Sequence, residues 1–171
     1  SDFLYEIIDY ITTGKHPNLV LDQETELLST YGRDAAVSWM NATIDGKPAV
    51  PRSGYLVEFN ALWYNVLKFS EEIARTKNKD KVASDFEERA RLAGNSFKEL
   101  FLNPAGYLYD YVDGNYKDPD VRPNMLFAVS LPYSPLERGQ NKSVIDFITK
   151  ELLAACGIRS LTPKSDKFRP H

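Results

Sequence analysis

The 171-residue sequence is poor in the residues that build disulfides and metal centres. It has one cysteine, Cys156, and two histidines, His16 and His171. A single cysteine excludes an internal disulfide and fits a reducing compartment, so a cytoplasmic location is expected. Two histidines this far apart are too few for a metal site or a catalytic triad. The sequence therefore predicts no metal and no cofactor.

The chain also lacks an excess of positive charge and a long apolar run. It has 21 basic and 24 acidic residues, for a formal net charge of −3. This charge argues against a nucleic-acid partner. The absence of a run of about 18 apolar residues argues against a membrane span. With 43% hydrophobic and 26% charged residues, the composition is that of an ordinary globular domain, and residues 1–171 fit one unit with its own core.

Apolar residues recur at helical spacing in several segments. The clearest period runs through Val82, Phe86, Ala90, Ala93 and Phe97. Ser143 is a plausible N-cap for the last of the main helices. The patterns predict four main helices and one shorter helix, over residues 2–13, 56–76, 82–101, 143–152 and, for the shorter one, 122–131.

Signals for strands are few and short. The Asp45-Gly46 pair predicts a hairpin within residues 43–50. Residues 107–112 alternate and predict a short strand or extended segment. Residues 18–34 are expected to be irregular. Because alternating βαβ units are absent, the sequence favours an all-α array of antiparallel helical hairpins joined by long, decorated loops.

Residues 39–65 are the most informative stretch of the chain. They contain both tryptophans, and Pro48 and Pro51 prevent a helix in their first half. A polar, aromatic loop therefore leads directly into an amphipathic helix. Loops held by a rigid scaffold are where binding and catalytic residues usually lie.

Several motifs across the chain, in order, resemble the C-terminal glucosidase domain of glycogen debranching enzymes, the amylo-α-1,6-glucosidase family. The family carries Trp-Met-Asp-Ala, then Thr-Pro-Arg-x-Gly-x-x-Val-Glu-Ile-Asn-Ala-Leu-Trp-Tyr-Asn, then Leu-Tyr-Asp-Val-Val-Asp-Gly and Arg-Pro-Asn. The corresponding residues here are Trp39-Met40-Asn41-Ala42, Val50 to Asn65, Leu108 to Gly114, and Arg122-Pro123-Asn124. Residues 151–153 and 157–163 resemble later family motifs as well.

The resemblance implies an (α/α)₆ toroid, in which six helical hairpins surround a sugar-binding funnel. Twelve helices of ordinary length need a much longer chain than this one. Residues 1–171 are therefore expected to be a single fragment, the middle arc of a larger glucosidase domain. The rest of the parent polypeptide is expected to pack against it, and the implied partner is an α-glucan such as a glycogen-like oligosaccharide.

The resemblance also implies two catalytic carboxyl groups for an inverting hydrolysis of α-1,6-linked glucose. Asn41 occupies the position of the family's general acid, and an amide has no proton to give. Asp34, Asp45 and Glu58 are nearby carboxylates that are alternatives for this role. The general base is expected beyond His171, so the fragment alone is expected to be inactive.

The family motifs imply further contacts with sugar. Arg52 and Glu58 either bind glucose hydroxyls or form an ion pair that ties the loop to the helix. Of Trp39 and Trp63, one is expected to stack on a sugar and the other to be buried. Arg122 and Asn124 either contact sugar or cap the helix that they begin. The expected substrate-binding residues are Trp39, Arg52, Glu58, Trp63, Arg122 and Asn124.

Three functions stay open at this point. The first is part of a debranching-type α-glucosidase. The second is a catalytically silent glucan-binding or regulatory homologue, which Asn41 favours. The third is a plain helical scaffold for protein contacts.

Overall fold

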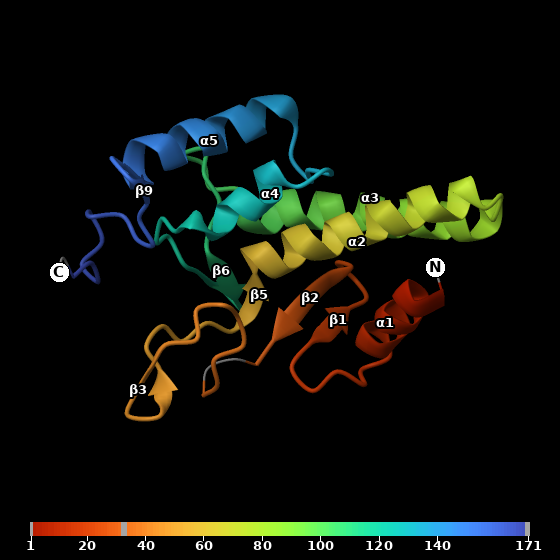
Figure 1. The fold of residues 1–171 in the computed structure, drawn as a ribbon, viewed down its shortest axis with the longest axis horizontal. Helices are drawn as coiled ribbons and strands as arrows, with labels where there is room; N and C mark the ends of the chain where they lie inside the picture. Colours follow the sequence, from red (N-terminus) through yellow and green to blue (C-terminus); the bar gives the residue numbers. More distant parts are fainter. Residues whose placement is uncertain (1, 32–33, 170–171) are drawn as a thin grey trace.

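The structure is a computed structural model that describes residues 2–31 and 34–169. Its two longest helices form an antiparallel pair at the centre, and the other helices lie on either side of this pair (Figure 1). The helices are α1 (Asp2–Thr12), α2 (Val57–Thr76), α3 (Asp80–Phe101), α4 (Phe127–Ser130) and α5 (Arg138–Leu152), with a 3₁₀ helix η1 (Pro123–Leu126) directly before α4.

A five-stranded antiparallel sheet packs at the N-terminal end of α2. Its strands, in spatial order, are β1 (Val20–Asp22), β2 (Leu27–Thr30), β5 (Gly54–Leu56), β6 (Tyr111–Asp113) and β7 (Tyr116–Lys117). Two small hairpins stand apart from it, β3 (Thr43–Ile44) with β4 (Lys47–Pro48) and β8 (Leu153–Ala154) with β9 (Gly157–Ile158).

The prediction of an all-α fold is wrong. The described residues are 45% helical and 15% strand, and the five-stranded sheet is not compatible with an arc of an all-α toroid. The physical reason is strand length. Each strand of this sheet has only two to four residues, too few for alternation to show in the sequence, and β1 and β2 fall in the segment that was expected to be irregular.

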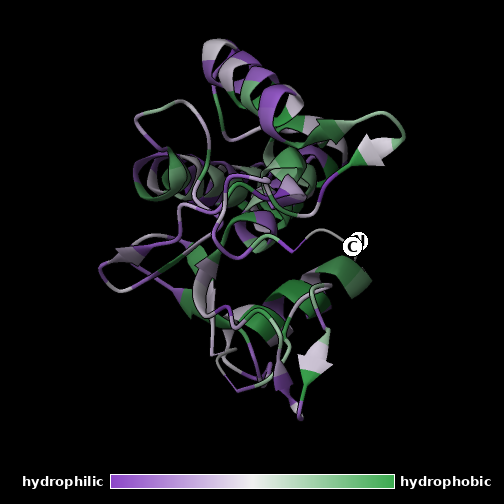
Figure 2. Cartoon of the chain, turned by 90° about the vertical axis from the view of Figure 1, so that its left-hand side faces the viewer, coloured by the Kyte–Doolittle hydropathy of each residue, from purple (hydrophilic) through white to green (hydrophobic). Residues whose placement is uncertain are grey.

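The core lies between α2, α3 and the sheet. Phe97, Phe101, Leu67 and Val57 are fully buried there, because α2 and α3 each place an apolar face toward the other. A view at 90° shows α5 on one side of this pair and α1, which is largely hydrophobic, on the other (Figure 2). In the described part of the chain, no helix is both long and apolar enough to cross a membrane.

The predicted helix boundaries agree with the structure for the first three helices and for the short segment at 122–131, which is η1 followed by α4. The hairpin around Asp45-Gly46 is confirmed. Helix α5 begins earlier than predicted because Glu137 and Gln140 form a capping box. Ser143 is therefore inside the helix and is not its N-cap.

Gly54 fixes the junction between the loop of residues 49–53 and the sheet. Its φ is +76°, and a Cβ atom at this position would lie 2.2 Å from the carbonyl oxygen of Val112 on the neighbouring strand. Only glycine allows β5 and β6 to approach this closely at such a φ. The close approach brings Arg52 and Ser53, just before β5, next to the residues around β6.

We expect Gly54→Ala to lower the free energy of unfolding by about 3 kcal/mol, from steric overlap together with left-handed backbone strain. Gly139→Ala is the control, since Gly139 lies in α5 with open space around its Cα, and helix propensity predicts a small gain in stability there. Urea unfolding of both variants measures the difference. Equal stabilities for the two variants would contradict this account of the junction.

Candidate functional site

The site begins with a buried ion pair between Arg52, just before β5, and Glu58, in the first turn of α2. Arg52 donates from Nη1 to Glu58 Oε1 at 2.5 Å and from Nη2 to Glu58 Oε2 at 2.8 Å. Both residues are 2% exposed. Of the two alternatives for this pair, the structure shows the one that ties the loop to the helix.

Asp110 lies at the centre of the network and belongs to the segment just before β6. Its Oδ2 is 2.8 Å from Arg52 Nε and 3.6 Å from Arg122 Nε. These contacts are ion pairs rather than aligned hydrogen bonds, because none of the three atoms has a well-oriented partner among the described residues. The Asp110 carboxylate, with 0% side-chain exposure, therefore faces two guanidinium groups inside the protein.

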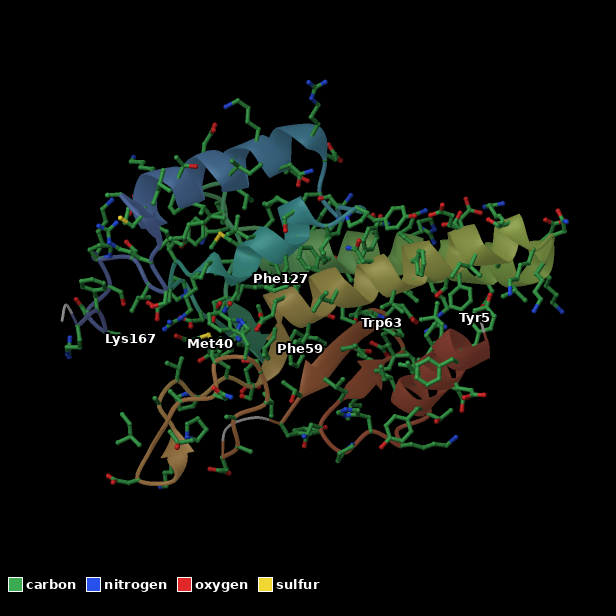
Figure 3. The ribbon with its side chains drawn as sticks, in the orientation of Figure 1. Tyr5, Met40, Phe59, Trp63, Phe127 and Lys167 are labelled. Carbon is green, nitrogen blue, oxygen red and sulfur yellow. The ribbon has the colours of Figure 1, made fainter. Side chains whose placement is uncertain are left out.

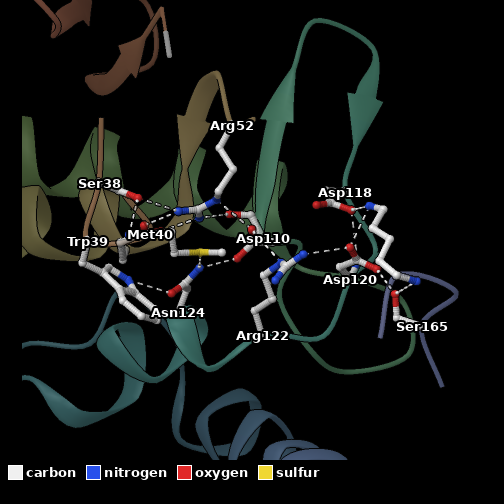
Figure 4. Close-up of polar contacts among 12 residues, drawn as sticks. Ser38, Trp39, Met40, Arg52, Asp110, Asp118, Asp120, Arg122, Asn124 and Ser165 are labelled. Atoms are coloured by element: carbon white, nitrogen blue, oxygen red, sulfur yellow. Dashed lines mark hydrogen bonds and ion pairs between the residues drawn. The ribbon is translucent and has the colours of Figure 1, made fainter. Parts of the chain in front are cut away.

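Asn124 connects this buried cluster to Trp39 at the surface (Figure 4). Its Nδ2 donates to Asp110 Oδ1 at 2.7 Å, and its Oδ1 accepts a hydrogen bond of 3.0 Å from Trp39 Nε1. The side chain of Asn124 makes no capping bond to η1, so the capping interpretation of this residue is wrong. Trp39 is 55% exposed although its only polar atom is satisfied.

Arg122 continues the network on the other side of Asp110. Its Nη2 contacts Asp120 Oδ2 at 3.2 Å, and Asp120 in turn binds Lys167 and Ser165 in the segment that follows β9. A continuous chain of polar contacts thus runs from Trp39 through Asp110 and Asp120 to Lys167. Figure 4 shows this chain as far as Asp120 and Ser165.

Two adjoining hollows lie over this network. The larger, of about 1010 Å³, lies between residues 44–51 and residues 159–169. The smaller, of about 260 Å³, is bordered by residues 39–42. They have in common Ala49, Val50, Arg122 and Ser160. We call the combined hollow the Arg122 groove; the larger hollow alone is at the upper end of the range of small-molecule sites.

The structure brings five of the seven predicted site residues into this network, namely Trp39, Arg52, Glu58, Arg122 and Asn124. A sixth, Asn41, is exposed and lines the small hollow beside Trp39. Of the alternative carboxylates, Asp34 and Asp45 are exposed, whereas Glu58 is occupied by Arg52.

Trp63, the seventh predicted residue, is not part of the groove. It lies on α2, away from the groove residues Met40 and Lys167 (Figure 3). It is 2% exposed, and its Nε1 donates to the carbonyl oxygen of Glu26 at 3.1 Å. The guanidinium of Arg89 lies over its ring. Trp63 is therefore the buried tryptophan of the two.

Sequence reasoning missed Asp110 and Asp120. Asp110 lies in the family motif of residues 108–114, but the alternation of residues 107–112 indicated only a short strand or extended segment and no role for its carboxylate. A usable signal was present, since Arg52 and Arg122 both lie in family motifs and two buried arginines need an acidic partner.

Among the described residues, no group of histidine, cysteine and carboxylate side chains is arranged to hold a metal ion. Cys156 is exposed, and His171 lies outside the described residues.

The electrostatics of the cluster reflect its burial. Burial raises the pKa of the Asp110 carboxyl to about 6, against the attraction of Arg52, and the charge of Glu58 adds to the increase. Burial also disfavours the Arg52 cation, but its hydrogen bonds to Glu58 and the charge of Asp110 raise the pKa of its guanidinium overall. The cluster thus contains the Arg52 cation and, beside it, an Asp110 carboxyl group whose pKa lies in the mildly acidic range.

Fold and site together define a mixed helix and sheet unit with a surface groove, an exposed aromatic ring at its rim and a buried arginine–carboxylate cluster beneath it. Residues 2–171 match the family described as Amylo-alpha-1,6-glucosidase. The chain belongs to this family, whose name indicates a glycosidase domain of the glycogen-debranching type. No curated protein matches the chain.

The raised pKa of Asp110 predicts a specific pH dependence of stability. Between about pH 4 and 6 the folded protein keeps a proton on Asp110 that the unfolded chain has released. The contribution of this group to the free energy of unfolding is therefore largest at low pH and falls as the pH rises through this window. In Asp110→Asn, which keeps an acceptor for Asn124, this dependence is absent.

We expect the difference in unfolding free energy, wild type minus Asp110→Asn, to fall by up to about 1.4 kcal/mol for each pH unit between pH 4 and 6. Urea unfolding of both proteins at several pH values measures it, and titrating groups that do not interact with Asp110 cancel in the difference. A difference that is constant or that rises over this range would contradict the raised pKa.

Proposed function

We propose that this chain is part of a glycogen-debranching-type α-glucosidase, which hydrolyses α-1,6-linked glucose in branched α-glucans by an inverting acid/base mechanism. In this proposal the Arg122 groove binds the glucan, and the rest of the parent polypeptide packs against the chain and supplies the missing catalytic group. The chain alone is proposed to bind glucan without cleaving it. A cytoplasmic location belongs to the same proposal.

The observation that carries the proposal is that the exposed ring of Trp39 is held in position through its N–H. A tryptophan that is half exposed normally leaves its N–H to water, whereas here the N–H is held by Asn124, which is anchored on buried Asp110. The ring is thereby held at the rim of the small hollow, and more than half of the residue's surface stays exposed. A fixed aromatic face beside polar side chains suits a pyranose, which has one apolar face and a rim of hydroxyl groups.

The arginine–carboxylate cluster supports the groove from below. Arg52, Glu58 and Asp110 are too buried and too fully engaged with one another to exchange a proton with a sugar in the groove. We therefore assign them to holding Arg122 and Asn124 in position. Arg122, which lines both hollows, is the cation proposed to meet glucan hydroxyls.

Proton donation to the leaving oxygen needs a carboxylic acid close to the groove. Asn41 lies at the expected place but can offer only a hydrogen bond from its amide. Asp45, at the tip of the β3–β4 hairpin, and Asp34, which borders a separate hollow with Ser53 and Gly54, are exposed carboxylates in the segment between β2 and β5. We propose that one of them, or a residue of the parent polypeptide, supplies the proton.

Trp39→Ala is expected to weaken binding of a branched maltooligosaccharide several-fold, up to about tenfold, because stacking on the ring is lost; aromatic pairs contribute about 0.5–1.5 kcal/mol beyond the area that they bury. Isothermal titration of the chain measures the affinity. Trp63→Phe is the matched control, since it changes the buried tryptophan and leaves the groove intact. Equal affinities of wild type and Trp39→Ala would count against the groove as the glucan site.

The silent homologue is the second candidate, and the amide of Asn41 in the groove is the observation that favours it. Asn41→Asp in the full-length parent separates the two functions. If the parent is an enzyme whose acid is weak or displaced, a carboxyl group at position 41 is expected to increase glucose release from an α-1,6-branched dextrin at least tenfold, as expected for a positioned general acid. If both the wild-type parent and Asn41→Asp release no glucose, the silent glucan-binding homologue is favoured.

A further inference from the structure

One carboxylate, Asp120, contacts both Arg122, which lines the groove, and the segment that forms one of the groove's walls. Its Oδ2 is 3.2 Å from Arg122 Nη2 and 2.7 Å from Lys167 Nζ, and its Oδ1 accepts a hydrogen bond of 3.0 Å from Ser165 Oγ. Asp120 does not line the larger hollow itself, whereas Arg122 and Lys167 do. It is thus placed to fix both residues without itself lining that hollow.

Asp120 contacts only the second part of the segment of residues 161–169, and the first part is held in place by other contacts. Its start is anchored independently, because Leu161 and Thr162 are buried and Thr162 N donates to Val121 O at 3.1 Å. Residues 166, 167 and 169 are exposed, and the polar side-chain contacts of residues 165–169 with the body of the protein run from Ser165 and Lys167 to Asp120 and, more weakly, from Lys167 to Asp118 at 3.9 Å. Lys164 has a separate partner, Glu151.

The ionisation of the pair agrees with this geometry. Burial would raise the pKa of the Asp120 carboxyl, but the hydrogen bonds from Lys167 and Ser165 lower it below its usual value. The hydrogen bond to Asp120 raises the pKa of the Lys167 ammonium. Both groups are therefore charged across the neutral range, and salt weakens their attraction because Lys167 is 60% exposed.

We infer that Asp120 is a positioning residue that sets the width of the Arg122 groove by holding residues 165–169 against Arg122. The inference deepens the proposed function and rests on it where it concerns glucan. In this inference the attraction between Asp120 and Lys167 holds one wall of the groove in place. Neutralising Asp120 therefore frees Lys167 and Phe168 at one side of the groove and leaves Trp39 at the other side unchanged. A glucan bound between the two sides then loses its contacts with residues 165–169.

The test uses Asp120→Asn with Asp166→Asn as the matched control. Asp166 lies in the same segment and loses the same charge, but its side chain is exposed and makes no hydrogen bond or ion pair among the described residues. Hydrogen exchange measures the amides of Ser165 and Phe168, which donate to Thr162 O and Ser165 O. We expect exchange at both to quicken about three- to tenfold in Asp120→Asn only, and the Thr162 amide to stay unchanged.

Isothermal titration of the same proteins with a branched maltooligosaccharide gives the second readout. We expect the affinity to fall about threefold or more in Asp120→Asn and to stay at the wild-type level in Asp166→Asn. In 1 M salt the exchange rates of wild type should approach those of Asp120→Asn. If Asp120→Asn does not fold, Lys167→Gln breaks the same pair from its exposed side.

Two results would overturn the inference: unchanged exchange at Ser165 and Phe168 in the folded variant, or faster exchange with a wild-type glucan affinity. A wild-type chain that binds no maltooligosaccharide instead contradicts the proposed function. In that case the exchange rates alone still decide whether Asp120 holds the segment.

Discussion

The placement of Asp110 between Arg52 and Arg122 is the interaction on which the rest of the structure depends. Two guanidinium groups are buried in a small protein, and each would be costly to leave without a counter-charge. Glu58 and Asp120 complete the set at its two ends. Because every member holds at least one other, the loop before β5, the first turn of α2, the segment before β6 and the segment before η1 are fixed relative to one another.

This cluster explains how a surface groove can be rigid although it is built mostly from loops. Asn124 extends the cluster to Trp39, and Asp120 extends it to Lys167, so both sides of the groove are tied to one buried centre. Gly54 makes the arrangement possible because only a residue without a side chain allows β5 to approach β6 so closely. The long helices α2 and α3 provide the core against which this assembly rests.

The sequence was informative where the pattern was long. The segments that became α2 and α3 repeat apolar residues over five or more turns, and their boundaries agree with the structure to within a few residues. The sheet was missed because its strands pair over stretches of two to four residues that are far apart in the chain, such as Tyr55 with Val112. Pairing of this kind depends on tertiary contacts that local periodicity does not report.

The site was predictable in composition but not in connectivity. The motifs singled out Trp39, Arg52, Glu58, Arg122 and Asn124, and the structure gathers these residues into one network. The sequence did not show that Asp110 links them or that Trp63 lies elsewhere.

The central claim is that the ring of Trp39, held through Asn124, forms one side of a glucan-binding groove. The indole N–H resonances of the chain test it most directly, since there are only two, from Trp39 and Trp63. On titration with a branched maltooligosaccharide, the account predicts a saturable shift of the Trp39 resonance with Trp63 unmoved; a Trp39 resonance that does not respond would contradict it.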